Sequence, residues 1–272
     1  MHLESWPPSR LSLQQTEEKD NMRNLELPSL VVFDLDDTLY DYQRANSFAL
    51  SQLTIALSDY GNIGKNEATL AIAASRSTVK RRLGETASSH SRILYISESF
   101  RQLQLKPDTE EFVRFEELYW STFLENIQLF PGVEKLLKFF QISGTRLALV
   151  TDLTSSIQYR KINKLGLNGF FELIVTSEEA GGDKSTGLPF RLLESLMETD
   201  CTSAWFFGDS SFDRPIQSNL ETLFFKKAMN LGVFENLSGY EFSDYLVLEK
   251  KLINFASFDL LPSIIDHSSS RD

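Results

Sequence analysis

The sequence predicts an α/β protein in which helices cover both faces of a parallel sheet and an all-helical block follows the first strand. Two observations favour this fold class. Short apolar runs closed by polar residues, which are typical of buried parallel strands, alternate with helical stretches over the second half of the chain. Between about residues 41 and 129 the pattern is instead helical and poor in strands. With 272 residues, 42% of them hydrophobic, the chain can bury a large core without a disulfide or a structural metal.

The first expected strand is residues 29–33, a short apolar run rich in β-branched residues. The helical block after it begins with an amphipathic stretch around residues 48–57, which Gly61 and Gly64 break. Three further helices are expected over residues 66–83, 89–103 and 109–127.

Past Pro131 and Gly132 the expected elements alternate. Apolar residues at the spacing i, i+3, i+4, i+7 predict a helix over residues 133–141. Strands are expected at residues 146–150, 171–175 and 203–207, with helices at 154–165 and 188–198 between them. We expect residues 223–225 to form the final core strand.

These elements divide the chain into four parts. Residues 1–28 are polar and lack a sustained period, so we expect a loosely ordered N-terminal extension. Residues 29–40 and 130–265 are expected to form the α/β core, residues 41–129 the helical block, and residues 266–272 a frayed tail.

Charge and composition exclude several classes of partner. Asp and Glu outnumber Lys and Arg by 38 to 27, a net charge of −11, whereas nucleic-acid binding needs a basic face. The single Cys201 allows no intramolecular disulfide framework and no cysteine-based zinc site. No apolar run is long enough to span a bilayer, and the first residues lack the layout of a secretory signal. We therefore expect a cytoplasmic protein that binds neither membrane nor nucleic acid; its oligomeric state is left open.

Polar side chains follow the expected strands at the points where they end. They are Asp34 and Asp36, then Thr151 and Asp152, then Lys184 in a longer loop, and then Asp209 and Asp213. Because ligands of an open parallel sheet bind outside the carboxyl ends of its strands, we expect these groups to meet at one rim.

The charges of this rim suggest its chemistry. Several carboxylates around one lysine repel one another unless a cation lies among them, so we expect Mg²⁺ there, with Asp34 and Asp209 as its natural ligands. The ion and Lys184 suit the rim to a phosphoryl group. A carboxylate such as Asp34 can attack phosphorus to form an aspartyl-phosphate. Asp36, two residues on, can protonate the leaving oxygen and later activate water.

At these residues the sequence resembles the haloacid dehalogenase superfamily of phosphohydrolases. Residues 34–39, Asp-Leu-Asp-Asp-Thr-Leu, resemble its D-x-D-x-T signature. Thr151 resembles the second motif, Lys184 the third, and residues 208–213, which include Asp209 and Asp213, the acidic fourth. The motifs occur in the family's order, each after an expected strand, and the resemblance covers about residues 30–225.

The resemblance implies a Rossmann-like core and three catalytic side chains. Asp34 would be the nucleophile and a metal ligand. Asp36 would be the general acid and base, with its backbone carbonyl on the Mg²⁺. Lys184 would neutralise the nucleophile and the phosphoryl group in transfer.

The resemblance also implies a phosphate site, a metal site and a cap. Thr151 and the backbone of Asp152 would bind phosphoryl oxygens. Asp209 would complete the metal shell, and Asp213 would act at its edge or just outside it. The helical block over residues 41–129 would be a mobile cap that excludes water and selects the substrate.

Some residues depart from the family pattern. The third motif often continues with proline, but here Lys184 is followed by Ser-Thr-Gly, which loosens the loop and keeps the charge. Asp213 is followed by Arg214 and Pro215; we favour a helix start at the proline over an arginine at the phosphate. Asp37, where many members carry glycine, is expected to support the turn.

A basic cluster of Arg76, Lys80, Arg81 and Arg82 lies in the expected cap. A solvated helix face is the favoured interpretation, because helical charge runs usually face water. Recognition of an anionic substrate is the alternative.

The leading hypothesis is a Mg²⁺-dependent phosphomonoester hydrolase acting on a small phosphorylated metabolite, such as a sugar phosphate or a nucleotide. A phosphomutase or phosphonatase of the same fold, and a non-catalytic ligand sensor or assembly module, are the alternatives. A dehalogenase is disfavoured because its chemistry leaves Asp36 and Asp209 unexplained. The substrate itself stays open, since specificity lies in cap residues that the sequence does not place.

Overall fold

The predicted strands form one parallel sheet in a computed structural model, which describes residues 26–197, 201, 203–215, 221–227 and 239–260. The six strands run in the order β3-β2-β1-β4-β5-β6, and every pairing is parallel. Their bounds are β1 (Leu30–Phe33), β2 (Arg146–Thr151), β3 (Leu173–Thr176), β4 (Ser203–Gly208), β5 (Glu221–Lys227) and β6 (Gly239–Phe242). The predicted fold class is confirmed. The expected tail at residues 266–272 and nearly all of the N-terminal extension lie outside the described residues.

Residues 223–225 lie in the core strand β5, as predicted, but they do not form the last strand of the sheet. A further strand, β6, pairs with β5, and helix α10 (Tyr245–Leu260) follows it. Strand β6 is an edge strand in the described sheet, and its side chains at Tyr240, Glu241 and Phe242 are only half-buried or exposed. It therefore lacks the continuous apolar run that marks the buried strands.

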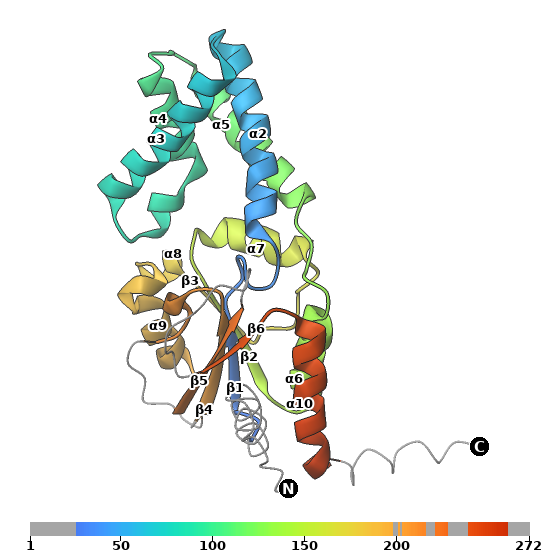
Figure 1. Cartoon of the computed structure of the whole chain (residues 1–272). Helices are drawn as coiled ribbons and strands as arrows, with labels where there is room; N and C mark the ends of the chain where they lie inside the picture. Colours follow the sequence, from blue (N-terminus) through green and yellow to red (C-terminus); the bar gives the residue numbers. More distant parts are fainter. Residues whose placement is uncertain (1–25, 198–200, 202, 216–220, 228–238, 261–272) are drawn as a thin grey trace, which may run out of the picture.

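Alternate residues of the strands build two cores, one on each face of the sheet. Val31 and Phe33 point to the face covered by α6 (Val133–Ile142) and α10, while Leu30 and Val32 point to the face covered by α9 (Leu188–Leu196). Figure 1 shows these helices on opposite sides of the sheet. Helix α7 (Ser155–Lys164) crosses near the carboxyl ends of the strands.

Between β1 and α6 the described chain forms helices and no regular strand. They are α2 (Tyr42–Gly61), α3 (Lys65–Leu83), the short 3-10 turn η2 (Ala87–His90), α4 (Arg92–Gln102) and α5 (Thr109–Glu125). We call residues 41–129 the helical block. It stands beyond the carboxyl ends of the strands (Figure 1). No helix in the described part of the chain is long and apolar enough to cross a membrane.

The two connections to the helical block run side by side. The backbone N–H of Phe130 donates to the carbonyl of Leu39 at 2.9 Å, and Tyr40 forms an antiparallel bridge with Leu129. The side chains of Leu39 and Tyr40 are fully buried. The entry and exit of the block are therefore joined directly above β1, next to the strand ends.

Candidate active site

A cavity of about 260 Å³ lies between the strand ends and the helical block. All the site residues singled out in the sequence line it: Asp34, Asp36, Thr151, Asp152, Lys184, Asp209 and Asp213. Their convergence follows from the strand order, because β2, β1 and β4 are neighbours and each ends at this rim.

Asp34 occupies the centre of the rim, directly after β1. Its carboxylate is buried and accepts hydrogen bonds from Lys184 Nζ (2.5 Å) and Thr38 Oγ1 (2.8 Å). Burial raises the pKa of Asp34 well above its ordinary value, Lys184 opposes that rise, and Asp213 and Asp209 add to it. Lys184 and Thr38 thus orient the two carboxylate oxygens of Asp34, the proposed nucleophile.

Lys184 reaches Asp34 although the proline that often follows it in the family is missing. Residues Lys184–Thr186 form a 3-10 turn, Gly187 takes a left-handed φ of 73°, and Pro189 lies in the first turn of α9. The ammonium group contacts both Asp34 and Asp213. Burial alone would lower the pKa of Lys184, but the two carboxylates raise it well above its ordinary value, so the lysine stays charged.

Asp34, Asp209 and Asp213 form the acidic centre of the cavity. Each offers one carboxylate oxygen within 4.8 Å of the others. Burial, and next the charge of Asp213, raise the pKa of Asp209 to about 7. The carboxylates therefore resist full ionisation when only Lys184 balances them, and a hard divalent cation with oxygen ligands, such as Mg²⁺, fits this donor set.

Asp213 is one of the three carboxylates of this acidic centre. It is buried, and its carboxylate accepts from the backbone N–H of Ser210 at 2.7 Å. A Cβ atom at Gly208 would lie 2.1 Å from the Cβ of Asp213. Only glycine at the end of β4 therefore leaves room for the Asp213 side chain in this position.

Thr151 ends β2 and is fully buried at the rim. Its hydroxyl oxygen accepts from Gln158 Nε2 at 2.6 Å, and the same amide donates to the carbonyl of Asp152 at 2.5 Å. The carboxylate of Asp152 accepts from the backbone N–H of Lys184 at 2.9 Å. Leu153, the next residue, has a backbone φ of 89°. This value is strained for any residue other than glycine, and Leu153 lies beside the site.

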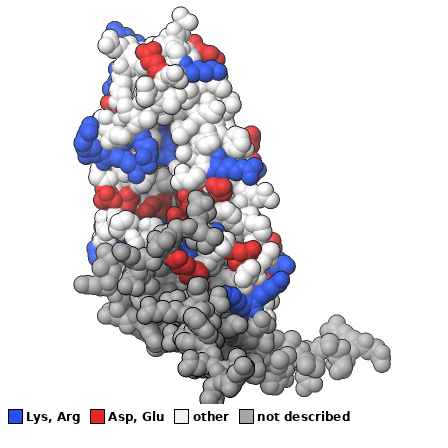
Figure 2. Space-filling model, in the orientation of Figure 1, with Lys and Arg blue, Asp and Glu red and all other residues white. Residues whose placement is uncertain are grey.

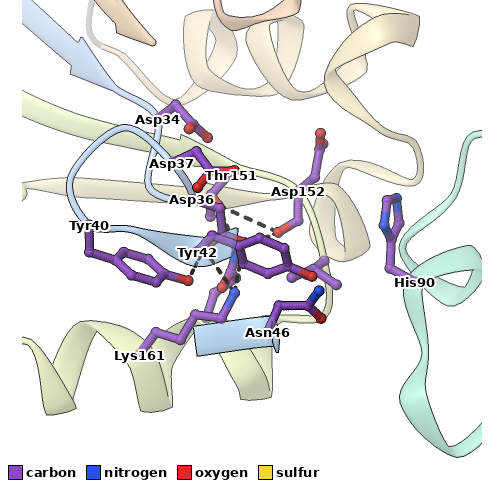
Figure 3. Close-up of polar contacts among 12 residues, drawn as sticks. Asp34, Asp36, Asp37, Tyr40, Tyr42, Asn46, His90, Thr151, Asp152 and Lys161 are labelled. Carbon is purple, nitrogen blue, oxygen red and sulfur yellow. Dashed lines mark hydrogen bonds and ion pairs between the residues drawn. The ribbon is translucent and has the colours of Figure 1, made fainter. Parts of the chain in front are cut away.

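Asp36 has a partner that the sequence did not indicate. Its two carboxylate oxygens lie 2.9 and 2.7 Å from Lys161 Nζ, and Tyr40 donates its hydroxyl to the same carboxylate. Figure 3 shows the Asp36 side chain directed toward Lys161. Lys161 is fully buried, with the rings of Tyr42 and Phe123 at 5.4 and 5.3 Å from its Nζ.

Sequence reasoning missed both Gln158 and Lys161, although a signal was present. On α7 these residues fall within the stripe of Ile157 and Ile162 that faces the core. A polar side chain within the buried stripe of an amphipathic helix needs a polar partner inside the protein. That signal marks both residues as candidates for the site, but it does not name their partners.

Other singled-out residues divide between the cavity and its surroundings. The carboxylate of Asp37 accepts hydrogen bonds from the backbone and side-chain N–H groups of Gln43, which confirms its role in the turn. Its φ of 62° lies in the left-handed region that favours glycine, which explains why many family members carry glycine at this position. Arg214 lies over the ring of Phe224 and does not line the cavity, while the helix start expected at Pro215 falls on residues 216–220, outside the described residues.

The basic cluster divides in the same way. Arg76 and Lys80 line the cavity, whereas Arg81 and Arg82 do not, and Arg82 pairs with Glu98 at 3.3 Å. His90, from η2, also lines the cavity and contacts Asp183 at 2.8 Å. The helical block therefore contributes basic side chains to a cavity whose other wall is acidic.

Known proteins match this chain over most of its length. A family model for haloacid dehalogenase-like hydrolases matches residues 31–220. The chain is 32% identical over 184 residues to the ribulose-1,5-bisphosphate 5-phosphatase of Halopiger xanaduensis, covering 67% of this chain and 77% of the relative. It is 23% identical to the glyceraldehyde 3-phosphate phosphatase of Methanocaldococcus jannaschii (80% and 91% covered) and 28% identical to a phosphoglycolate phosphatase of Cupriavidus necator (71% and 78% covered).

Solved structures that share this fold belong to proteins with different named activities. A magnesium-bound hydrolase of the haloacid dehalogenase type from Bacillus subtilis superposes with a TM-score of 0.58 at 24% identity, covering 84% of this chain and 99% of that one. A 2-haloacid dehalogenase from Pseudomonas syringae has the same TM-score at 19% identity, covering 85% and 100%. Because phosphate and halide chemistry share this fold, the side chains of the site have to decide between them.

Proposed function

This chain belongs to the haloacid dehalogenase-like hydrolases, and from that premise we propose that it is a Mg²⁺-dependent phosphomonoesterase acting on small phosphorylated metabolites. The observation that carries the proposal is the placement of Asp34. It lies between Lys184 and Thr38, beside Asp209 and Asp213, in one cavity at the strand ends. The three relatives compared above are all named as phosphatases of small phosphate esters, which supports the same substrate class.

The proposed reaction has two steps. In the first, a carboxylate oxygen of Asp34 attacks phosphorus, the bond from phosphorus to the ester oxygen breaks, and Asp36 donates a proton to the departing oxygen. In the second, Asp36 takes a proton from a water molecule, which attacks phosphorus and releases inorganic phosphate from Asp34. The products are an alcohol and phosphate. Asp34 is again a carboxylate, and Asp36, which enters the first step protonated, regains its proton from the water molecule.

Other side chains bind and balance charge during these steps. Lys184, held by Asp34 and Asp213, neutralises the phosphoryl oxygens as they approach the nucleophile. Thr151 is proposed to donate a hydrogen bond to one of those oxygens, with Gln158 fixing its hydroxyl. When bound, Mg²⁺ would supply positive charge beside Asp34, held by Asp34, Asp209 and the backbone carbonyl of Asp36.

The helical block is proposed to act as the cap of this site. Its residue Glu85 accepts from the backbone N–H of Asp183 and from Ser185 Oγ, on either side of Lys184. These contacts, with that of His90 to Asp183, hold the block against the loop that carries the catalytic lysine. A block closed in this way keeps bulk water from the acyl-phosphate.

The site favours a phosphatase over a dehalogenase. Halide displacement forms an ester on the nucleophile but needs no acid for a leaving oxygen and no metal. Asp36 and Asp209 would then have no use, although both line the cavity. The cluster of carboxylates around Lys184 is explained if a cation and a phosphoryl group occupy the site.

The direct experiment is hydrolysis of p-nitrophenyl phosphate with Mg²⁺ and then with excess EDTA, followed by a panel of phosphorylated metabolites ranked by kcat/KM. We expect turnover with Mg²⁺ that EDTA abolishes and added Mg²⁺ restores. Absence of metal-dependent phosphate release across the whole panel would favour the non-catalytic sensor instead.

A further inference from the structure

Arg76 and Lys80 form a pair of cations on the wall of the cavity that faces the catalytic carboxylates. They lie four residues apart on α3, so they project from the same face of the helix. Figure 2 shows Lys and Arg side chains of the helical block directly above a row of Asp and Glu side chains. The cavity therefore has an acidic wall from the strand ends and a basic wall from α3.

Lys80 does not lie on the solvated helix face that the sequence favours, whereas Arg76 is exposed but also lines the cavity. Lys80 is only half-exposed, and burial, followed by the nearby charge of Arg76, lowers its pKa. Among the described residues, neither Arg76 nor Lys80 has a carboxylate within ion-pair distance. Asp183 and Glu85 act on Lys80 from further away, and Asp183 already contacts His90.

Two like charges placed together, with Lys80 partly desolvated, are unfavourable in the free protein. The neighbouring Arg81 and Arg82 are exposed, as Arg76 is, but they lie outside the cavity, and Arg82 is paired with Glu98. An anion bound between Arg76 and Lys80 would remove the repulsion and gain charge-assisted hydrogen bonds.

That anion need not be the phosphoryl group in transfer. The proposed reaction places that group against Asp34, where Lys184 and Mg²⁺ balance its charge. Arg76 and Lys80 come from a different element and are additional to that balance.

We propose that the substrate carries a second anionic group, a carboxylate or a second phosphate, which Arg76 and Lys80 bind while its phosphoryl ester lies against Asp34. This inference rests on the proposed function and narrows its substrate class to phosphorylated acids and bisphosphates. A monophosphate ester without a second anionic group would enter the same cavity and leave the pair of cations without a partner.

The test compares substrates that differ only in the second anion. Phosphoglycolate is paired with ethyl phosphate, and ribulose 1,5-bisphosphate with ribulose 5-phosphate, so that the two pairs separate a carboxylate from a phosphate. Each substrate is assayed with Mg²⁺ on the wild-type chain and on Arg76→Gln, Lys80→Gln and the matched control Arg81→Gln, which lies on the same helix outside the cavity.

We expect the wild-type chain to favour the member with the second anionic group in at least one pair by about tenfold or more in kcat/KM. Arg76→Gln and Lys80→Gln should each raise the KM of that member by about 10- to 100-fold. The same variants should change kcat/KM for the member without the second anionic group by less than about twofold, and Arg81→Gln should change neither.

Two results would overturn the inference. Equal losses on both members of each pair would mean that the cations serve the phosphoryl group in transfer or the fold. No loss on any substrate would mean a solvated helix face. Calorimetric binding of the same four compounds to the Asp34→Asn variant tests the inference without turnover, and weak, equal binding of all four would contradict the second-anion site. By contrast, if the wild-type chain hydrolysed none of the esters, that result would contradict the proposed function.

Discussion

Lys161 and Asp36 form a partly buried ion pair that joins helix α7 to the exit of β1. The lysine Nζ lies 2.7 and 2.9 Å from the two carboxylate oxygens, and its side chain is fully buried. The rings of Trp120 and Phe123, from the helical block, lie within 5.8 Å of the same ammonium group. The proposed general acid is therefore tied to the core and to the base of the helical block at once, which makes Lys161 a positioning residue for Asp36.

Removal of this lysine should be costly. Lys161→Gln leaves the partly exposed Asp36 carboxylate without its cation, and losing a hydrogen bond to a charged group typically costs about 1.5–3 kcal/mol. Urea unfolding should show that loss in the free energy of unfolding. Lys164→Gln, an exposed lysine on the same helix, is the matched control and should change it by less than about 0.5 kcal/mol. Similar effects of the two substitutions would contradict the structural role of the pair.

The metal-free protein should lose stability as the pH rises. Because burial and Asp213 raise the pKa of Asp209 from 3.8 to about 7, the folded chain binds more protons than the unfolded chain between these values. Stability contributed by the protonated group is thus present at low pH and falls through this window. Since Mg²⁺ competes with protons for the carboxylates, the gain in Tm from Mg²⁺ should be larger at about pH 8 than at about pH 5.5.

Asp209→Asn provides the matching test of the same site. At about pH 8 in EDTA this variant should melt about 2–5 °C higher than the wild-type chain, since it removes a carboxylate that is costly to ionise. It should also lose the Tm gain from Mg²⁺. A wild-type response to Mg²⁺ in this variant would remove Asp209 from the metal site. Thermal melts with and without the ion decide the point.

Thr151 should matter for catalysis more than for folding. Thr151→Val keeps the shape of a buried residue and removes the hydroxyl that Gln158 orients, so kcat/KM should fall about 10- to 100-fold. Thr145→Val is the control, because Thr145 is also buried but lies just before the other end of β2 and bonds Pro28. Equal losses of activity in the two variants would indicate a packing effect instead of a contact with phosphate.

Much of the core and its rim followed from the sequence because buried strands and their polar ends have local signals. Strand β1 is apolar throughout, and β2 and β4 are apolar apart from Arg146, Thr151 and Ser203 at their ends. Asp34 and Asp209 directly follow β1 and β4. Parallel order then brings the polar ends together without further information. Strand β6 was missed because an edge strand with exposed Glu241 has no such run.

The remaining features depend on tertiary geometry. Asp36 and Lys161 are 125 residues apart, and no local pattern pairs them. The inward position of Asp213 depends on the missing side chain of Gly208. Whether Arg76 or Arg81 faces the cavity depends on how the helical block is rotated against the sheet, which periodicity within α3 does not determine.

Hydrolysis by Asp34→Asn tests the central claim most directly. Asn keeps the shape of the side chain and removes the nucleophilic carboxylate, so kcat for p-nitrophenyl phosphate with Mg²⁺ should fall at least about a thousandfold. The matched control is Asp37→Asn, which alters a cavity carboxylate outside the proposed reaction at a backbone position that asparagine tolerates. We predict that the control keeps measurable Mg²⁺-dependent turnover while Asp34→Asn does not. Full activity in Asp34→Asn would contradict an aspartyl-phosphate mechanism at this site.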